Sequence, residues 1–232
     1  MVRRRSYASY NDGCAAARAL DVVGERWALL IVRELLLGPK RFSDLQRDVI
    51  GVSATALTQR LRDLEERDVL RQEVLPAPAR VPVYRLTAWG ERLEDVITAL
   101  SLWGSQSTEL RDADMSPDTV MLAMRAHARP DPGPDPEKTH RVEIELADAR
   151  HDDAAPVSYT STVEPAGASL IRGGGARADV RVATDSRTWQ HLVFGRVALE
   201  DAVAAGRLTV IPDEPASHRS VARVLRVHAV GA

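Results

Sequence analysis

The sequence contains very few cysteines, lysines and aromatic residues. Its 232 residues include one cysteine, Cys14, and aromatic residues make up 4% of the chain. A single cysteine excludes an intrachain disulfide and any zinc site built from several cysteines. Lys40 and Lys138 are the only lysines, so almost every cationic side chain is an arginine. This usage says little about function.

Long apolar runs and metal-binding patterns are also absent from the sequence. No stretch approaches the roughly 20 apolar residues that a membrane helix needs, and residues 6–12 are polar where a signal peptide would be apolar. The six histidines show neither paired spacing nor a cysteine companion, so we expect no metal and no cofactor. No Gly-x-Ser-x-Gly motif is present, and no enzymatic activity is expected. These absences predict a cytoplasmic protein that does not bind membranes.

Composition and length indicate an ordinary soluble protein with two domains. Hydrophobic residues make up 44% and charged residues 28% of the chain, and the net charge is −2. A chain of 232 residues can form two domains that each bury a core. We expect a first domain at residues 1–105, a linker at 106–117 and a second domain at 118–232.

Residues 41–86 contain two helical patterns followed by two strand patterns. The helices are predicted at residues 41–50 and 54–66, and the strands at residues 69–74 and 81–86, on either side of a proline-rich tip. A helix-turn-helix followed by a hairpin is the winged form of a DNA-binding module. The order of these elements therefore predicts a transcription regulator that binds double-stranded DNA.

The helix at residues 54–66 has one apolar and one polar face. Leu57, Leu61 and Leu64 recur at helical spacing and should pack inward. The opposite face carries Gln and Arg, which can make bidentate hydrogen bonds to base edges, while basic side chains near the two helices and on the hairpin can bind phosphate. A polar outer face is also typical of any surface helix. The candidate DNA-binding residues are Lys40, Arg41, Ser43, Ser53, Thr55, Thr58, Gln59, Arg62 and Arg80.

Further helices are predicted on both sides of this module. Residues 14–23 and 25–37 form two helical patterns, and Glu34 falls within the apolar stripe of the second. Thr87 is expected to cap a long helix that continues to Gly104, with a wide apolar stripe that includes Leu100 and Trp103. Such a stripe must pack against another apolar surface, which could be the first two helices of the same chain or a partner subunit. Because regulators with this module usually read two half-sites, we expect a homodimer.

In the second domain the hydrophobic period changes between helical and strand spacing. Apolar and charged residues alternate strictly at residues 141–146, which predicts a half-buried strand. Four shorter strand patterns follow, and Gly173–Gly174–Gly175 is expected to turn a hairpin between two of them. Helices are predicted at residues 118–128, 185–196, 197–205 and 214–227. The second domain is thus expected to be α+β with an antiparallel sheet.

Several separated motifs in the first domain resemble those of HxlR-type winged-helix regulators, a group close to MarR-like proteins. The similar segments are Cys14 with the Ala-rich helix after it, Gly24-Glu25-Arg26-Trp27, Arg33-Glu34-Leu35, Arg41-Phe42-Ser43-Asp44-Leu45, residues 53–65 and residues 84–90. The resemblance implies a homodimer whose interface is built from the first helix and the long last helix of the domain. One departure is Ala15, where many members of the group have proline.

The second domain is similar to the sterol-carrier-protein fold. The similar segments are residues 180–185, 195–202 and 206–210, and a departure is Ile211-Pro212-Asp213, where relatives often have a glycine. This resemblance implies an apolar tunnel between sheet and helices. Plain core packing is the alternative for each residue on its wall. The candidate ligand-binding residues are Met121, Met124, Trp189, Val193 and Phe194, and a hydrophobic small-molecule effector is expected.

Other functions remain open from the sequence. Cys14 is a candidate sensor of oxidants or electrophiles, with Arg18 one helical turn away to lower its pKa, or it is a small buried side chain. If Cys14 is the sensor, the second domain only supports the dimer. The protein could instead be a carrier of hydrophobic molecules with a vestigial DNA-binding domain, or an enzyme that uses a cavity in the second domain.

Overall fold

The protein divides into two compact units. The computed structural model describes residue 10 and residues 12–107, 113–130, 138–174 and 178–230. The units comprise Met1–Ile97 and Thr98–Ala232, so their boundary lies inside a helix and before the predicted domain end at residue 105. Part of the predicted linker at 106–117 falls outside the described residues. Within the described part of the chain, no helix is long and apolar enough to span a bilayer.

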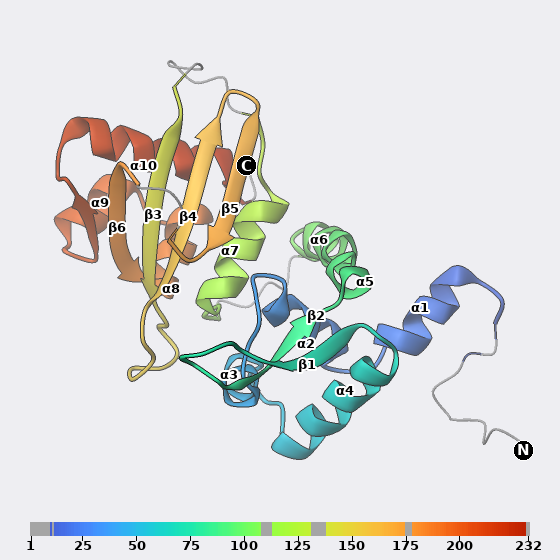
Figure 1. Cartoon of the computed structure of the whole chain (residues 1–232). Coiled ribbons are helices and arrows are strands. Elements are labelled where there is room, and N and C mark those ends of the chain that lie inside the picture. The colour runs from blue at the N-terminus through green and yellow to red at the C-terminus, as the bar shows by residue number, and fades with distance from the viewer. Residues whose placement is uncertain (1–9, 11, 108–112, 131–137, 175–177, 231–232) are drawn as a thin grey trace, which may run out of the picture. The chain divides into compact units, whose positions relative to one another are not determined.

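The N-terminal unit has the predicted order of helices and strands (Figure 1). The helix at residues 54–66 has the predicted bounds, and it begins after Ser53 because the Ser53 side chain accepts a hydrogen bond from the Ala56 N–H and caps it. The elements are α1 (Ala15–Val23), α2 (Ala28–Leu35), α3 (Phe42–Asp48), α4 (Ala54–Glu66), β1 (Leu70–Val74), β2 (Pro82–Leu86), α5 (Ala88–Glu91) and α6 (Leu93–Gly104), which crosses the boundary of the unit.

The long helix predicted from Thr87 to Gly104 is two helices. The Thr87 side chain caps α5 as expected, and its Oγ1 accepts a hydrogen bond from the Gly90 N–H at 3.1 Å. The N–H of Arg92 then donates to the carbonyl of Trp89, three residues back, at 3.2 Å. This tighter turn ends α5, and α6 starts immediately after it.

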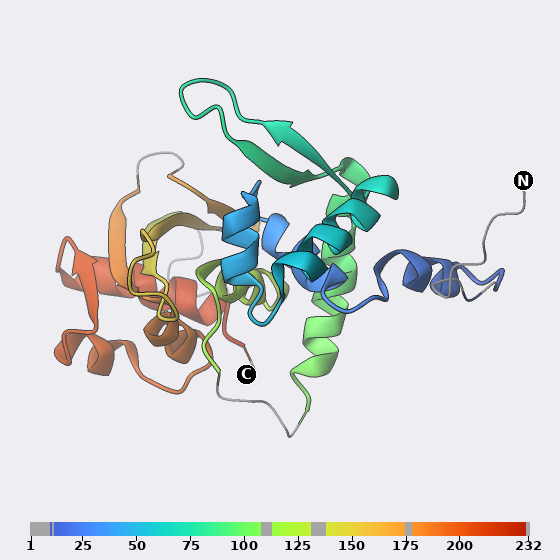
Figure 2. The same ribbon diagram turned by 90° about the horizontal axis from the view of Figure 1, so that it is seen from below.

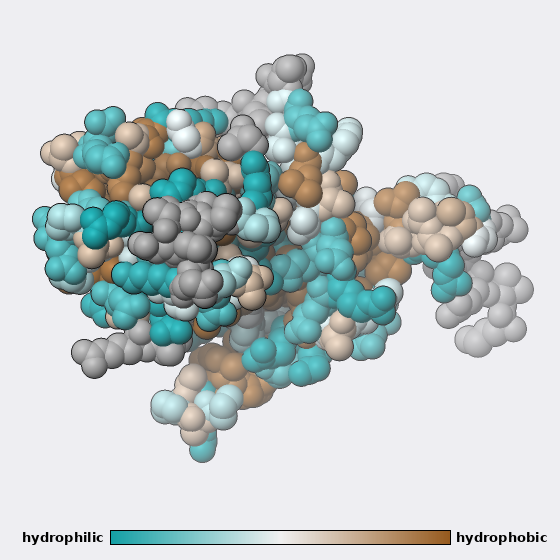
Figure 3. All heavy atoms as spheres, turned by 90° about the horizontal axis from the view of Figure 1, so that it is seen from above, coloured by the Kyte–Doolittle hydropathy of each residue, from teal (hydrophilic) through white to brown (hydrophobic). Residues whose placement is uncertain are grey.

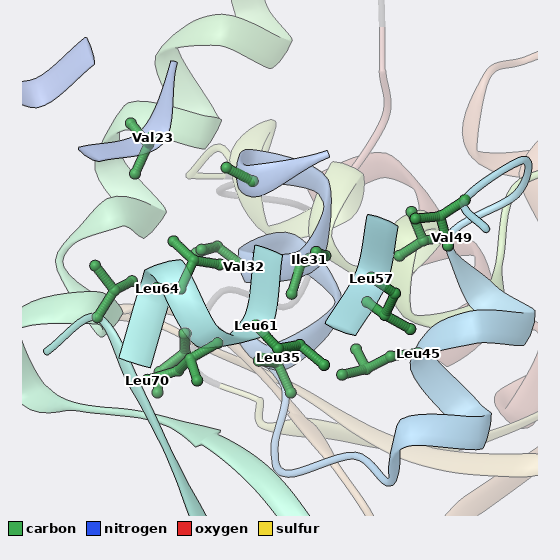
Figure 4. Close-up of a cluster of buried hydrophobic side chains, with 14 residues drawn as sticks. Val23, Ile31, Val32, Leu35, Leu45, Val49, Leu57, Leu61, Leu64 and Leu70 are labelled. Atoms are coloured by element: carbon green, nitrogen blue, oxygen red, sulfur yellow. The ribbon is translucent and has the colours of Figure 1, made fainter. Parts of the chain in front are cut away.

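Apolar side chains from three helices form much of the core of the N-terminal unit. Ile31 of α2, Leu45 of α3 and Leu57, Leu61 and Leu64 of α4 are almost fully buried and belong to one cluster (Figure 4). Truncating one such leucine to alanine typically costs about 2–5 kcal/mol of stability. The predicted apolar stripe of α4 is therefore what holds the helix against the rest of the unit.

The two strands form a hairpin that projects from the helices (Figure 2). They are antiparallel, with Leu70 opposite Leu86 and Gln72 opposite Tyr84. Lys40 extends this small sheet, because its backbone N–H donates to the Tyr84 carbonyl at 3.1 Å and its carbonyl accepts from the Tyr84 N–H at 2.8 Å. Lys40, two residues before α3, is thus tied to the hairpin by two backbone hydrogen bonds.

The C-terminal unit combines a five-stranded sheet with helices, an α+β arrangement as predicted (Figure 1). The strands lie in the order β5-β4-β3-β6-β7. The elements are α7 (Pro117–Ala126), β3 (His140–Ala147), β4 (Val157–Glu164), β5 (Gly167–Arg172), β6 (Val180–Asp185), α8 (Ser186–Val193), α9 (Leu199–Ala204), β7 (Leu208–Ile211) and α10 (Pro215–Val227).

Three of the four strand pairs in this sheet are antiparallel, in agreement with the prediction. The pair β3–β6 differs, because these two central strands run parallel. The predicted hairpin at Gly173–Gly174 is also wrong, since β5 pairs with β4 at one edge while β6 pairs with β3. The chain after β5 must cross β4 and β3 to reach the position of β6, so no hairpin can form there.

Alternate residues of β3 are buried as its sequence predicts, and α8 and α10 pack against this strand. Two polar side chains are fully buried in the same core. His228 lies with its Nδ1 2.9 Å from the Met124 carbonyl and its Nε2 3.5 Å from Ser161 Oγ. Burial lowers the pKa of His228, so its imidazole is neutral near pH 7.

Candidate nucleic-acid interface

The outer face of α4 presents the predicted reading residues to solvent. Thr55, Gln59 and Arg62 are exposed, while Leu57, Leu61 and Leu64 of the same helix are buried. Ser53 is also exposed, but its hydroxyl oxygen already accepts the capping hydrogen bond from Ala56. The structure therefore places Thr55, Gln59 and Arg62 on one exposed face of α4, and no bulky side chain lies on this face in the first turn.

Two of these side chains have hydrogen bonds within the helix. Gln59 Nε2 donates to Asp63 Oδ1 at 2.8 Å, which engages one of the two N–H groups of the amide. Thr58 is partly buried, and its hydroxyl donates to the Ala54 carbonyl at 2.8 Å. Thr58 is thus left with its methyl group for contact, and Arg62 is the side chain best placed for bidentate binding.

Three other candidates lie at the start of α3 and at the tip of the β1–β2 hairpin. Arg41 and Ser43 are exposed at the start of α3, where Arg41 is the N-cap residue. Arg80 is exposed at the tip of the β1–β2 hairpin, in a left-handed conformation with φ of 42°. Their exposure is suitable for phosphate contacts on either side of the reading helix.

Lys40 is not part of this surface, which corrects the prediction made from its charge. Its side chain is 3% exposed, and Nζ lies 2.7 Å from Glu34 Oε2 and 2.7 Å from Asp48 Oδ2. Arg33 and Arg47 bind the outer sides of the same two carboxylates, at 2.8 and 2.9 Å. The ammonium group is therefore enclosed by two carboxylates and cannot reach a phosphate.

The buried charge cluster alters the titration of both acids. Burial alone would raise the pKa of Glu34 and of Asp48, because it disfavours a charged carboxylate. The positive charges of Lys40, Arg33 and Arg47 outweigh burial, and the pKa of each acid is lowered. Both carboxylates are accordingly ionised near pH 7, which keeps the ion pairs intact.

The wing carries two arginines that sequence reasoning did not assign to the DNA surface. Arg71 of β1 and Arg85 of β2 both lie against Glu73, at 3.5 and 2.6 Å. Hydrogen bonding to Arg85 lowers the pKa of Glu73. The register of the hairpin, which places Arg71 opposite Arg85 on one face, is what brings the two arginines together.

Cys14 is exposed at the N-cap of α1. The backbone N–H groups of Ala17 and Ala16 at the start of α1 lower the pKa of its thiol. The sequence pointed to Arg18 for this effect, whereas the structure assigns it to the helix N-terminus. A thiolate at this position would be accessible to reagents in solution.

The predicted ligand-binding residues lie together in the core of the C-terminal unit. Met121, Met124, Trp189 and Val193 are buried, and Phe194 is partly buried. Trp189 Nε1 donates to Met124 Sδ at 3.2 Å, which joins α8 to α7. Contact with a ligand stays a prediction for all five. Among the residues that the structure describes, no group of three or more His, Cys, Asp or Glu side chains could hold a metal ion.

Known proteins are similar to this chain over its winged helix-turn-helix. The model of the HxlR-like helix-turn-helix family matches residues 22–112. The HTH-type transcriptional regulator YodB of Bacillus subtilis is 33% identical over 94 residues, which are 40% of this chain and 84% of YodB. The HTH-type transcriptional regulator YvaP of the same organism is 34% identical over 90 residues, which are 38% of this chain and 82% of YvaP.

Two solved structures are similar to part of this chain. An oxidized form of the redox regulator HypR has 28% sequence identity and a TM-score of 0.39, and it covers 42% of this chain and 100% of HypR. A reduced form of YodB from B. subtilis has 32% identity and a TM-score of 0.37, and it covers 41% of this chain and 95% of YodB.

The burial of Lys40 leads to a stability prediction. Lys40→Met should lower the free energy of unfolding by about 3–5 kcal/mol, because it leaves two carboxylates buried without their shared counter-ion. Urea unfolding followed by circular dichroism measures this, with Arg41→Met, at the exposed neighbour, as the control that should change little. Equal stability of the two variants would mean that the ammonium is not buried as described.

The pH dependence of stability should reverse in the same variant. In the wild type the folded pKa values of Glu34 and Asp48 lie below the ordinary values of 4.5 and 3.8 for these side chains. Their contribution to stability is therefore present above about pH 4.5 and is lost as pH falls. In Lys40→Met burial dominates and raises both pKa values, so acidification toward pH 5 should stabilise the variant relative to pH 7. Parallel pH profiles would contradict this.

Proposed function

Because this chain belongs to the HxlR-like helix-turn-helix family of transcription regulators, we propose that it binds a pseudo-palindromic DNA operator as a homodimer whose affinity responds to a regulatory input. The observation that carries the DNA-binding part is the exposed outer face of α4. Gln59 and Arg62 lie on this face behind the Ser53 cap, and the wing with Arg80 projects beside the helices (Figure 2). In this proposal α4 enters the major groove, and Arg41 and Arg80 bind phosphates.

The charge of the N-terminal unit fits a binder that depends on local placement. Residues 1–105 contain 16 Lys and Arg against 14 Asp and Glu, a surplus of only two. Several of these cations are committed to carboxylates, such as Lys40 to Glu34 and Arg60 to Asp63. Sequence-independent attraction to DNA should consequently be modest, and base contacts should contribute a large share of operator affinity.

Reading and phosphate contacts can be separated by two substitutions. The operator is first recovered by selection from random double-stranded DNA with the full-length protein. Arg62→Ala should then cost about 1–3 kcal/mol and relax preference at one base pair. Arg80→Ala should weaken binding to all sequences alike and reduce the slope of log affinity against log salt by about one.

The control for both variants is Arg207→Ala, which removes an exposed arginine from the C-terminal unit and should leave operator and random DNA binding unchanged. If selection enriches no sequence, the regulator proposal fails. If Arg62→Ala keeps the full operator preference, the assignment of the reading face fails while DNA binding stands.

The support for a homodimer is the uncovered apolar face of α6. None of its residues is buried, and Val96, Leu100 and Trp103, which share one side of the helix, are 43%, 46% and 73% exposed. Leu20 of α1 is also exposed, and the space-filling view shows apolar residues on the surface of this helix, at the right (Figure 3). Such contiguous apolar surface commonly marks an interface, and two-fold symmetry matches a pseudo-palindromic operator.

Charge in the proposed interface should separate the subunits. Leu100→Glu should convert a micromolar dimer into a monomer in sedimentation velocity and abolish high-affinity operator binding, because each monomer holds a single half-site. Ser101→Glu is the matched control, since it adds the same charge to α6 away from the side of Val96, Leu100 and Trp103. A wild-type monomer at micromolar concentration would refute the homodimer.

For the regulatory input we propose a hydrophobic small molecule bound by the C-terminal unit. This unit is not required for the helix-turn-helix, and its proposed resemblance to a sterol-carrier fold supplies a candidate apolar site near Met121, Met124, Trp189, Val193 and Phe194. The balance of residues 106–232 is acidic, with 15 Lys and Arg against 19 Asp and Glu, so the unit is a poor DNA-binding surface. An effector acts by binding two conformations with different affinity.

A second candidate input is oxidation or alkylation of Cys14. The observation that favours it is an exposed thiol whose pKa is lowered by the N-terminus of α1. A larger thiolate fraction at neutral pH increases reactivity toward electrophiles. Because α1 also carries exposed apolar residues, a modification at Cys14 would act close to the proposed dimer interface.

The two inputs predict different results for the full-length protein. If Cys14 is the sensor, a quinone or peroxide should release operator DNA from the wild type but not from Cys14→Ser. If the C-terminal unit is the sensor, both proteins should respond alike, and native mass spectrometry of the purified dimer should show a co-purifying hydrophobic molecule. Absence of both responses would leave a constitutive regulator and contradict the proposal of an input.

A further inference from the structure

The segment Gly24–Trp27, between α1 and α2, has an unusual backbone. Trp27 is the N-cap residue of α2 and adopts a left-handed conformation, with φ of 78° and ψ of −19°. A bulky residue rarely adopts positive φ, and it does so only where the surrounding structure fixes it. The Ile31 N–H donates to the Trp27 carbonyl at 2.8 Å, so the strained residue begins the helix and is not a frayed end.

The indole of Trp27 reaches the turn of the helix-turn-helix. A Cβ added to Gly51, which lies between α3 and α4, would be 3.5 Å from Cη2 of the ring, so the ring edge lies against this glycine. Gly51 itself has φ of 86°, which favours glycine at this point of the turn. On the ring, the guanidinium carbon of Arg26 lies 4.5 Å from the centroid. This cation–π contact and the partly buried position of Trp27 limit ring rotation.

The same segment contacts α4 at a second point. Glu25 Oε2 lies 3.5 Å from Arg60 of α4, whose other guanidinium nitrogen binds Asp63 one turn further along at 2.9 Å. Arg60 is mostly buried, with 17% of its side chain exposed, so its direction is set by packing as well as by charge. The segment thus makes one contact with the turn before α4, at Gly51, and one near the middle of α4, at Arg60, and the two together constrain the orientation of the helix.

We propose that Trp27 is a positioning residue for the reading helix, and that Gly24–Trp27 links the placement of α1 to the angle of α4. The proposal rests on the DNA-binding function proposed above. Trp27 fixes the turn at Gly51, and the Glu25–Arg60 pair fixes rotation about the helix axis. Gly24 ends α1 by donating its N–H to the Leu20 carbonyl at 2.8 Å, so a shift of α1 reaches this segment directly.

The test compares specificity with stability in the full-length protein. Trp27→Asn keeps a residue that tolerates positive φ but removes the ring. Its ratio of operator to random DNA affinity should fall about tenfold, the equivalent of one lost bidentate base contact. Leu36→Ala is the matched control, because it truncates a partly buried side chain in the same core at the other end of α2. It should lower the melting temperature and leave the affinity ratio unchanged.

Two further variants, Trp27→Tyr and Glu25→Gln, separate positioning from loss of packing and from a change of charge. Trp27→Tyr keeps a ring long enough to approach Gly51 and should restore most of the affinity ratio. Glu25→Gln removes an acidic group near the DNA-binding helix, so electrostatics alone would tighten binding to every sequence. Loss of positioning instead predicts weaker operator binding with unchanged affinity for random DNA, and the sign of the change separates the two causes.

Three results would overturn the inference without touching the DNA-binding function. The first is an unchanged affinity ratio in Trp27→Asn, and the second is an equal fall in Leu36→Ala at the same loss of melting temperature. The third is tighter operator binding by Glu25→Gln. If the wild type itself has no operator preference, the proposed function fails first, and the variants then add nothing to that conclusion.

Discussion

The arrangement of the N-terminal unit depends on the ion pairs of Lys40. Its ammonium group binds both Glu34 of α2 and Asp48 at the end of α3, while the backbone of Lys40 pairs with Tyr84 of the wing. One residue thereby joins two helices and the hairpin. Moving three charged groups out of water is costly, and the desolvation penalty is offset only when the geometry leaves none of them unpaired. Arg33 and Arg47 complete this geometry from the outer side.

This cluster has a consequence for how the unit can bind DNA. Lys40, two residues before α3, is withdrawn from the surface, and the exposed cationic candidates are arginines: Arg41 at the start of α3, Arg62 on α4 and Arg80 at the hairpin tip. Arginine binds bases and phosphates through a planar fork, so it contributes direction as well as charge. A unit with a small surplus of positive charge then depends on where α4 points. Orientation by Trp27 and Arg60 matters more here than it would on a strongly basic surface.

The sequence predicted local structure well and long-range partners poorly. The bounds of α4 follow from the Ser53 cap and the leucine stripe, which are both local signals. The burial of Glu34 was also visible, because it lies within an apolar stripe, and a buried carboxylate requires a partner. That partner was missed because Lys40 was assigned to the surface from its charge alone. The parallel β3–β6 pair was missed because alternation defines the faces of a strand but not its neighbours.

Both units bury paired charges, Lys40 with Glu34 and Asp48 in the N-terminal unit and Arg150 with Asp148 in the C-terminal unit. In the C-terminal unit the buried groups include a neutral histidine, His228, beside the Ser161 hydroxyl. If Nδ1–H donates to the Met124 carbonyl, Nε2 is left as the acceptor for the hydroxyl of Ser161. An interior with this neutral group suits an uncharged, hydrophobic effector better than a charged one, which would need a counter-ion of its own.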